Sequence, residues 1–275
     1  MIIGKDIIEL LSGAMYLEPL SLYREYIQNS IDAIEEAKCS SLLSCDQEAN
    51  IQIDIDTERR RISICDNGIG VSNVSFEKKL LSFGASEKRG TKLRGFRGIG
   101  RLSGLGYCQE LIFRSRSDKN EKIKEIIWDA RRLKKILQDN NEKRDLRFVI
   151  DEITTINEFK DDSYPERFFQ VVLNKPLRIK HDALLNSDKV IEYLSQVAPV
   201  PFHPDFIFKD EILSEIRNVT SYSEVQIFVN QNEEPIFRPF RNEFKFKENE
   251  KVEITEINYF LIEGNNSEVS ALCWV

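Results

Sequence analysis

The segment at residues 19–38 is predicted to be a helix with a polar stripe along one side. With about 100° per residue, Glu25, Asn29 and Asp32 lie within about 60° of one another. Three apolar side chains gather on the opposite side, namely Ile27, Ile31 and Ile34. Alone, this pattern is typical of an ordinary surface helix. Two motifs further along the chain change that interpretation.

A β-hairpin is predicted next, because isoleucines alternate with polar residues at 51–55 and 62–64, on either side of an arginine-rich turn. The second strand leads into Asp66, which Gly68 and Gly70 follow. Glycine lets a backbone approach a ligand closely, and a carboxylate accepts a hydrogen bond from an exocyclic amine. Asp-Asn-Gly alone is also a common turn, so the motif acquires meaning only from its neighbours.

A glycine-rich segment follows at residues 93–106, where Gly95, Gly98 and Gly100 precede a run predicted to be helical. Free backbone N–H groups at such a helix start suit a phosphate group. No Gly-Lys-Ser/Thr follows, so this is not a Walker loop, and the strand and acidic residue of a dinucleotide fingerprint are missing. A flexible hinge is the alternative interpretation.

In this order and spacing, the three motifs resemble those of the GHKL ATPases. They read Glu-x-x-x-Asn-x-x-Asp-Ala, then Asp-x-Gly-x-Gly, then Gly-x-x-Gly-x-Gly. That superfamily includes gyrase-type topoisomerase subunits, heat-shock protein 90 chaperones, sensor histidine kinases and MutL-type mismatch-repair proteins. The resemblance covers roughly residues 1–155, and a looser similarity continues to the end.

The resemblance implies an α+β fold, an α/β sandwich of the Bergerat (GHKL) type. Helices would cover one face of a mixed, mostly antiparallel sheet. We expect an ATP-binding domain at 1–198, a proline-rich boundary at 198–204, and an S5-like second domain at 205–275 that is cut short. Other predicted helices lie at 7–17 and 164–197, and the charged stretch at 131–145 is predicted to be a helix or a hairpin. Other predicted strands lie at 110–115, 122–128, 225–229, 236–240 and 252–262.

The resemblance also gives each motif residue a role, with ATP or ADP and Mg²⁺ as cofactors. Glu25 matches the general base that polarises the attacking water, and Asn29 matches the amide that ligates Mg²⁺. Asp32 is a supporting acidic residue, and Asp66 matches the carboxylate that reads the adenine N6 amine. The residues that shape the adenine pocket or wrap the phosphates are Gly68, Gly70, Gly95, Arg97, Gly98, Ile99 and Gly100.

Two further segments bear on the expected nucleotide site. Residues 82–94 correspond to the ATP lid, whose Lys88 and Lys92 either reach phosphates or are simply solvated. The family's Gly-Thr pair, which places a hydroxyl near adenine, is missing from 145–153, the segment that we expect to correspond to it. Another group would then complete the hydrogen bonds around adenine.

The global composition fits a cytoplasmic enzyme domain without a membrane partner. A net charge of −7 and a pI near 5.2 argue against a protein dominated by nucleic-acid binding. The five cysteines form no C-x-x-C pair, and no apolar run reaches membrane-spanning length. Neither His181 nor His203 follows a pattern expected of a phospho-acceptor, which together with Glu25 argues against a histidine kinase.

We therefore expect Mg²⁺-dependent ATP binding and slow hydrolysis that drives a conformational change, as in heat-shock protein 90-like chaperones. An ATP-dependent homodimer of the full-length protein and an unidentified protein client are the expected partners. One alternative is a DNA-associated ATPase of the MutL or MORC type, because residues 95–98 read Gly-Phe-Arg-Gly as in MutL. Another is a nucleotide-gated interaction module that hydrolyses little ATP.

Overall fold

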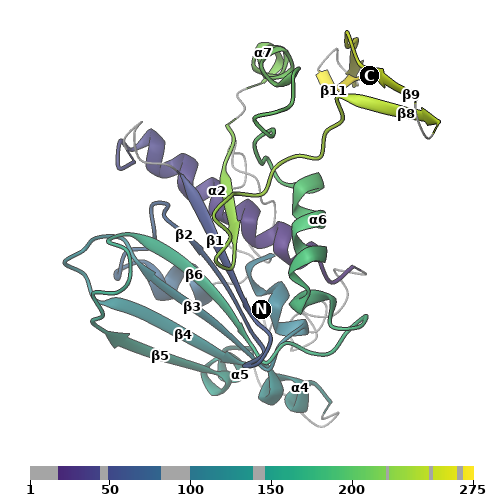
Figure 1. The fold of residues 1–275 in the computed structure, drawn as a ribbon. Coiled ribbons are helices and arrows are strands. Elements are labelled where there is room, and N and C mark those ends of the chain that lie inside the picture. Colours follow the sequence, from purple (N-terminus) through teal and green to yellow (C-terminus); the bar gives the residue numbers. More distant parts are fainter. Residues whose placement is uncertain are drawn as a thin grey trace.

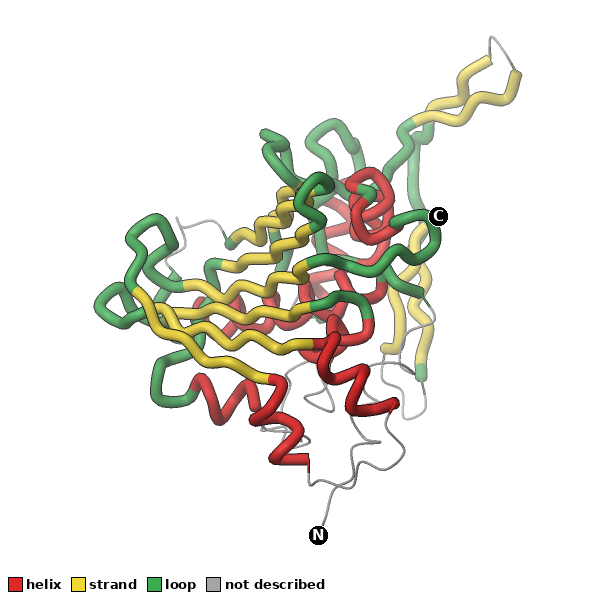
Figure 2. The backbone as a smooth tube through the Cα atoms, turned by 90° about the horizontal axis from the view of Figure 1, so that it is seen from below, coloured by secondary structure: helices red, strands yellow, loops and turns green. Residues whose placement is uncertain are grey.

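The computed structural model describes residues 18–43, 49–81, 100–138, 146–220, 223–247, 250–264 and 269–275. The predicted helix at 7–17, the lid at 82–94 with Lys88 and Lys92, and four glycine-loop residues lie outside this part of the chain. Those four are Gly95, Arg97, Gly98 and Ile99. The described residues form a large sheet with helices gathered along one face (Figures 1 and 2).

Seven strands make up the main sheet, in the order β5-β4-β3-β6-β2-β1-β7. They are β1 (Asn50–Asp56), β2 (Arg61–Asp66), β3 (Glu110–Arg116), β4 (Ile123–Asp129), β5 (Thr154–Phe159), β6 (Phe168–Asn174) and β7 (Gln226–Val229). All neighbours are antiparallel except β1 and β7, which run parallel. The expected mixed, mostly antiparallel sheet with helices on one face is confirmed.

The β1–β2 hairpin forms because its isoleucines alternate toward the core. Ile53 pairs with Ile64 across the hairpin, and both are buried while Asp54 is exposed. Arg60 adopts a left-handed conformation in the turn, with φ of 50°. Its guanidinium binds Asp182 with two hydrogen bonds of 2.8 and 2.9 Å, which ties the turn to the segment after β6.

The helices are α2 (Ser21–Cys39), α3 (Phe76–Leu81), α4 (Ala130–Gln138), α5 (Leu146–Ile153), α6 (Ser187–Val197) and α7 (Lys209–Val219). The described residues also form two 3₁₀ helices, η1 (Gly100–Gly106) and η2 (Ala183–Leu185). Helix α2 is the central one: it contacts β2, η1 and α6, and it buries the expected isoleucine face at Ile27, Ile31 and Ile34. The helix predicted at 19–38 is confirmed.

Several sequence expectations are wrong. The strand predicted at 236–240 holds only an isolated bridge at Arg238, next to Pro239, which has no N–H for a strand ladder, and the strand predicted at 252–262 is interrupted at 254–258.

Part of the helix predicted at 164–197 is strand β6, which lies between β2 and β3. Its nearly continuous apolar run from Phe168 to Leu173 is buried in the sheet, a pattern that periodicity cannot separate from a buried helix. The segment 145–153, expected to hold the strand that corresponds to the Gly-Thr pair, contains helix α5, which buries Val149, Ile150 and Ile153.

The C-terminal region contains two antiparallel ribbons. One pairs β8 (Glu243–Lys247) with β9 (Glu250–Glu253), and the other pairs β10 (Tyr259–Glu263) with β11 (Val269–Trp274). A small aromatic cluster around Phe202 and Phe206 packs against Trp274.

Strand β7 belongs to the main sheet although it follows the predicted boundary, so the division into 1–198 and 205–275 stays a prediction. In the described part of the chain, no helix has the length and apolarity needed to cross a bilayer.

Candidate nucleotide site

Helix α2 places Glu25 against the end of the glycine-rich segment. A Cβ added to Gly100, the first residue of η1, would come within 2.5 Å of the Glu25 Oε2. The other carboxylate oxygen of Glu25 lies 3.3 Å from the Arg24 guanidinium, and the Glu25 side chain is 27% exposed. The structure therefore brings the candidate base and one glycine of the candidate phosphate loop into direct contact, with the carboxylate still reachable by water.

Asp66 ends β2 as a buried carboxyl group that is only 2% exposed. It accepts hydrogen bonds from the Gly68 backbone N–H at 3.0 Å, from the Ser30 hydroxyl and from the Phe169 backbone N–H. Burial disfavours the charged form and raises the pKa of Asp66 to about 7, although these three hydrogen bonds oppose the rise. An adenine N6 amine would favour the ionised form, because it donates to the carboxylate.

The turn after Asp66 is packed closely against the protein's own backbone. A Cβ on Gly68 would lie 2.7 Å from the Ala33 carbonyl carbon, and the next residue, Ile69, donates its N–H to the Ala33 carbonyl at 3.0 Å. Gly70 has a φ of +67°, and a Cβ there would overlap the Arg116 carbonyl oxygen. Both positions thus need glycine for contact with α2 and β3, in addition to any approach of a ligand.

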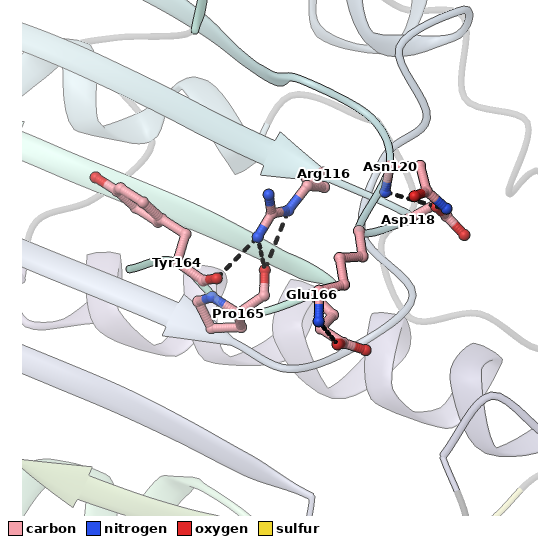
Figure 3. Close-up of polar contacts among 7 residues, drawn as sticks. Arg116, Asp118, Asn120, Tyr164, Pro165 and Glu166 are labelled. Carbon is pink, nitrogen blue, oxygen red and sulfur yellow. Dashed lines mark hydrogen bonds and ion pairs between the residues drawn. The ribbon is translucent and has the colours of Figure 1, made fainter. Parts of the chain in front are cut away.

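A second set of contacts ties this turn to strands β3 and β6. The Val71 N–H donates to the Ser115 hydroxyl at 2.8 Å, and that hydroxyl donates to the Phe168 carbonyl at 2.7 Å. The next residue, Arg116, is buried and donates to the backbone carbonyls of Tyr164 and Pro165 (Figure 3). Ser30 and Ser115 belong to no motif that the sequence shows, and their hydroxyls hydrogen-bond to Asp66 and to the turn after it, respectively.

Asn29 and Asp32 follow Glu25 along α2 without forming an acidic metal cluster. Asn29 is half-buried one helical turn after Glu25, and Asp32 is 4% exposed. Among the described residues, no three His, Cys, Asp or Glu side chains are grouped to hold a metal ion. Mg²⁺, which proteins usually hold by one or two oxygens together with substrate phosphates and waters, stays a prediction of the sequence. The Asn29 amide oxygen is the candidate protein ligand.

Residues 21–161 match the family described as Histidine kinase-, DNA gyrase B-, and HSP90-like ATPase, and the chain belongs to this family. Among curated proteins it is similar to the chaperone protein HtpG of Buchnera aphidicola (29% identical over 146 residues, 46% of this chain). It is also similar to HtpG of Idiomarina loihiensis (23% over 141 residues, 45%) and of Coxiella burnetii strain RSA 331 (26% over 146 residues, 46%). The matched segment covers only 22–23% of the length of these relatives.

Gly100→Ala is expected to lower ATP turnover with little loss of stability. The added methyl meets the mobile end of Glu25, so the carboxylate must move away rather than the backbone. A displacement of about 1 Å in a catalytic group can reduce the rate on the order of 10²-fold. Steady-state phosphate release and thermal unfolding measure the two effects. An unchanged rate of phosphate release in Gly100→Ala would mean that the added methyl does not displace the Glu25 carboxylate from its working position.

Proposed function

We propose that this chain binds ATP with Mg²⁺ and hydrolyses it slowly to drive a conformational change, as a heat-shock protein 90-like ATPase. The observation that carries the proposal is the position of α2 between two parts of one site. Its Glu25 touches Gly100, where the glycine-rich segment ends, and its Ser30 touches Asp66. Glu25 and Ser30 are five residues apart on α2, which is about 7.5 Å along the helix axis. Family membership over residues 21–161 supports the same proposal.

Each residue then has a chemical task. Asp66 accepts a hydrogen bond from the adenine N6 amine, in a buried position where mispairing is costly. Glu25 orients the attacking water and takes its proton, and the Arg24 guanidinium at 3.3 Å helps to fix the carboxylate. We assign the phosphates to the backbone at the start of η1, where the glycine-rich segment ends. Asn29 would hold Mg²⁺ through its amide oxygen, and the ion would supply positive charge against the phosphate oxygens.

The similarity to HtpG favours the chaperone branch over a DNA-associated ATPase. A dimer that forms with ATP, and a protein client, are part of this proposal for the full-length protein. Cytoplasmic location is proposed on the same ground. The nucleotide-gated module differs from the enzyme only in turnover, so hydrolysis measurements separate the two.

Asn29→Ala should weaken ATP binding by about 10-fold or more in Mg²⁺, the scale seen when partners of metal ligands are removed. In the presence of EDTA, the variant and the wild type should bind alike, because the lost oxygen serves only the metal. Titration calorimetry under both conditions makes the comparison. Absence of saturable ATP binding by the wild type would overturn the proposed function. An equal loss with and without Mg²⁺ would remove Asn29 from the metal site.

A further inference from the structure

The hydroxyl of Tyr26 is inserted into the first turn of η1. Tyr26 directly follows Glu25 on α2 and is 2% exposed. Its hydroxyl donates to the Arg101 carbonyl at 3.1 Å and accepts from the Gly104 N–H at 3.0 Å. These two backbone groups are the acceptor and donor that a 3₁₀ turn pairs directly, since they are three residues apart. The tyrosine hydroxyl therefore bridges a carbonyl and an N–H that lie three residues apart in η1.

The space for this bridge exists because residue 104 is glycine. A Cβ on Gly104 would lie 2.5 Å from the Tyr26 hydroxyl and 2.8 Å from a methyl group of Leu111. A buried tyrosine hydroxyl needs a polar partner, and both backbone groups that it bonds belong to η1. The contact is therefore specific to this pair of elements: a side chain from α2 enters a backbone turn that only glycine leaves open.

The bridge fixes η1 next to the candidate base. Glu25 touches Gly100 at the start of η1, and Tyr26 holds the following turn at Arg101 and Gly104. Two consecutive residues of one helix thus contact one short 3₁₀ helix. Without the hydroxyl, the Arg101 carbonyl and the Gly104 N–H lose the side chain that joins them to α2. Gly100 would then shift relative to the Glu25 carboxylate.

We propose that Tyr26 is a positioning residue for hydrolysis, which sets the position of η1 relative to Glu25. The inference rests on the proposed ATPase function and deepens it. Tyr26 acts through backbone groups of η1. Loss of its hydroxyl should therefore affect the geometry of the reaction more than the affinity for the nucleotide. Asp66, on the other side of α2, keeps its hydrogen bonds when the Tyr26 hydroxyl is lost.

Tyr26→Phe in the complete chain should reduce kcat for ATP by about 10-fold or more, within the range expected for a misplacement of about 1 Å. The KM and the Kd for ATP should stay within about threefold, because uniform binding is unchanged. Tyr23→Phe is the matched control. Tyr23 lies on the same helix, is equally buried, and donates its hydroxyl to the Leu184 carbonyl at 2.7 Å, away from η1. It should lower the melting temperature as much as Tyr26→Phe does while leaving kcat unchanged.

A second measurement tests the bridge without nucleotide. Gly104→Ala should lower the melting temperature of the wild type more than that of Tyr26→Phe, where the hydroxyl that the methyl would meet is absent. Equal losses in both backgrounds would overturn the inference, and so would equal kcat values for Tyr26→Phe and an active wild type. A kcat loss shared by Tyr23→Phe would reduce Tyr26 to a structural residue. A wild type without turnover would instead overturn the proposed function itself.

Discussion

Glu25→Ala is expected to abolish measurable ATP turnover while leaving nucleotide affinity within a few fold. The carboxylate acts on the attacking water, so its contribution belongs to the transition state and not to the bound nucleotide. Loss of a general base costs about 10²–10⁴-fold in rate, which brings a slow ATPase below the background of most assays. Phosphate release at saturating ATP gives the rate, and calorimetry gives the affinity.

Glu36→Ala on the same helix is the matched control, because Glu36 is an exposed glutamate beyond the site. It should retain both turnover and affinity. If Glu25→Ala hydrolysed ATP as fast as the wild type in the full-length protein, Glu25 would not be the base. If instead nucleotide affinity fell as far as turnover, the carboxylate would act in binding, and the contact with Gly100 would have to be reinterpreted as part of the phosphate site.

The elements that the sequence predicts correctly are those whose patterns are local. Helix α2 and the β1–β2 hairpin each show their own period, because each buries one face against a single core. Strand β6 and helix α5 differ from the sequence predictions for different reasons. Helix α5 shows a helical period of its own, with Leu146, Val149, Ile150 and Ile153 at i, i+3, i+4 and i+7, and the expectation of a strand there rests on the family resemblance. The short apolar run of β6 has no such period, and only its neighbours decide whether it becomes a central strand or a packed helix. For β6 those neighbours are β2 and β3, which are about 50 to 100 residues away in sequence.

The candidate site divides in the same way. Glu25, Asp66 and Gly100 could be identified because each belongs to a motif that is continuous in sequence. Ser30, Ser115 and Tyr26 could not, because their partners come from other elements: β2 for Ser30, β6 and the turn after Asp66 for Ser115, and η1 for Tyr26. Tyr26 and Ser30 each directly follow a motif residue on α2, Glu25 and Asn29 respectively. That position is a local signal in the sequence, and Ser115 does not have it.

The second large effect concerns the adenine side of the site. Asp66→Asn is expected to weaken ATP and ADP binding by about 5–150-fold, since mispaired buried polar groups cost about 1–3 kcal/mol. The asparagine amide nitrogen would face one of the donors that now point at the carboxylate, which are the Gly68 and Phe169 N–H groups and the Ser30 hydroxyl. Calorimetry with ADP measures the loss. Asp54→Asn, an exposed carboxyl on the neighbouring strand, should bind ADP like the wild type.

The dependence on pH separates a role in recognition from a role in folding. Because burial raises the pKa of Asp66 from 3.8 to about 7, the folded protein binds more protons than the unfolded chain between these values. The contribution of Asp66 to unliganded stability is therefore present below pH 4 and is lost as pH rises through about 7. Adenine binding favours the ionised form and should have the opposite dependence, so the ratio of wild-type to Asp66→Asn affinity for ADP should fall as pH drops from 8 to 6. This ratio cancels the titration of the ADP phosphates, which is common to both proteins. A ratio that stays constant over this range would mean that Asp66 stabilises the turn without reading the base.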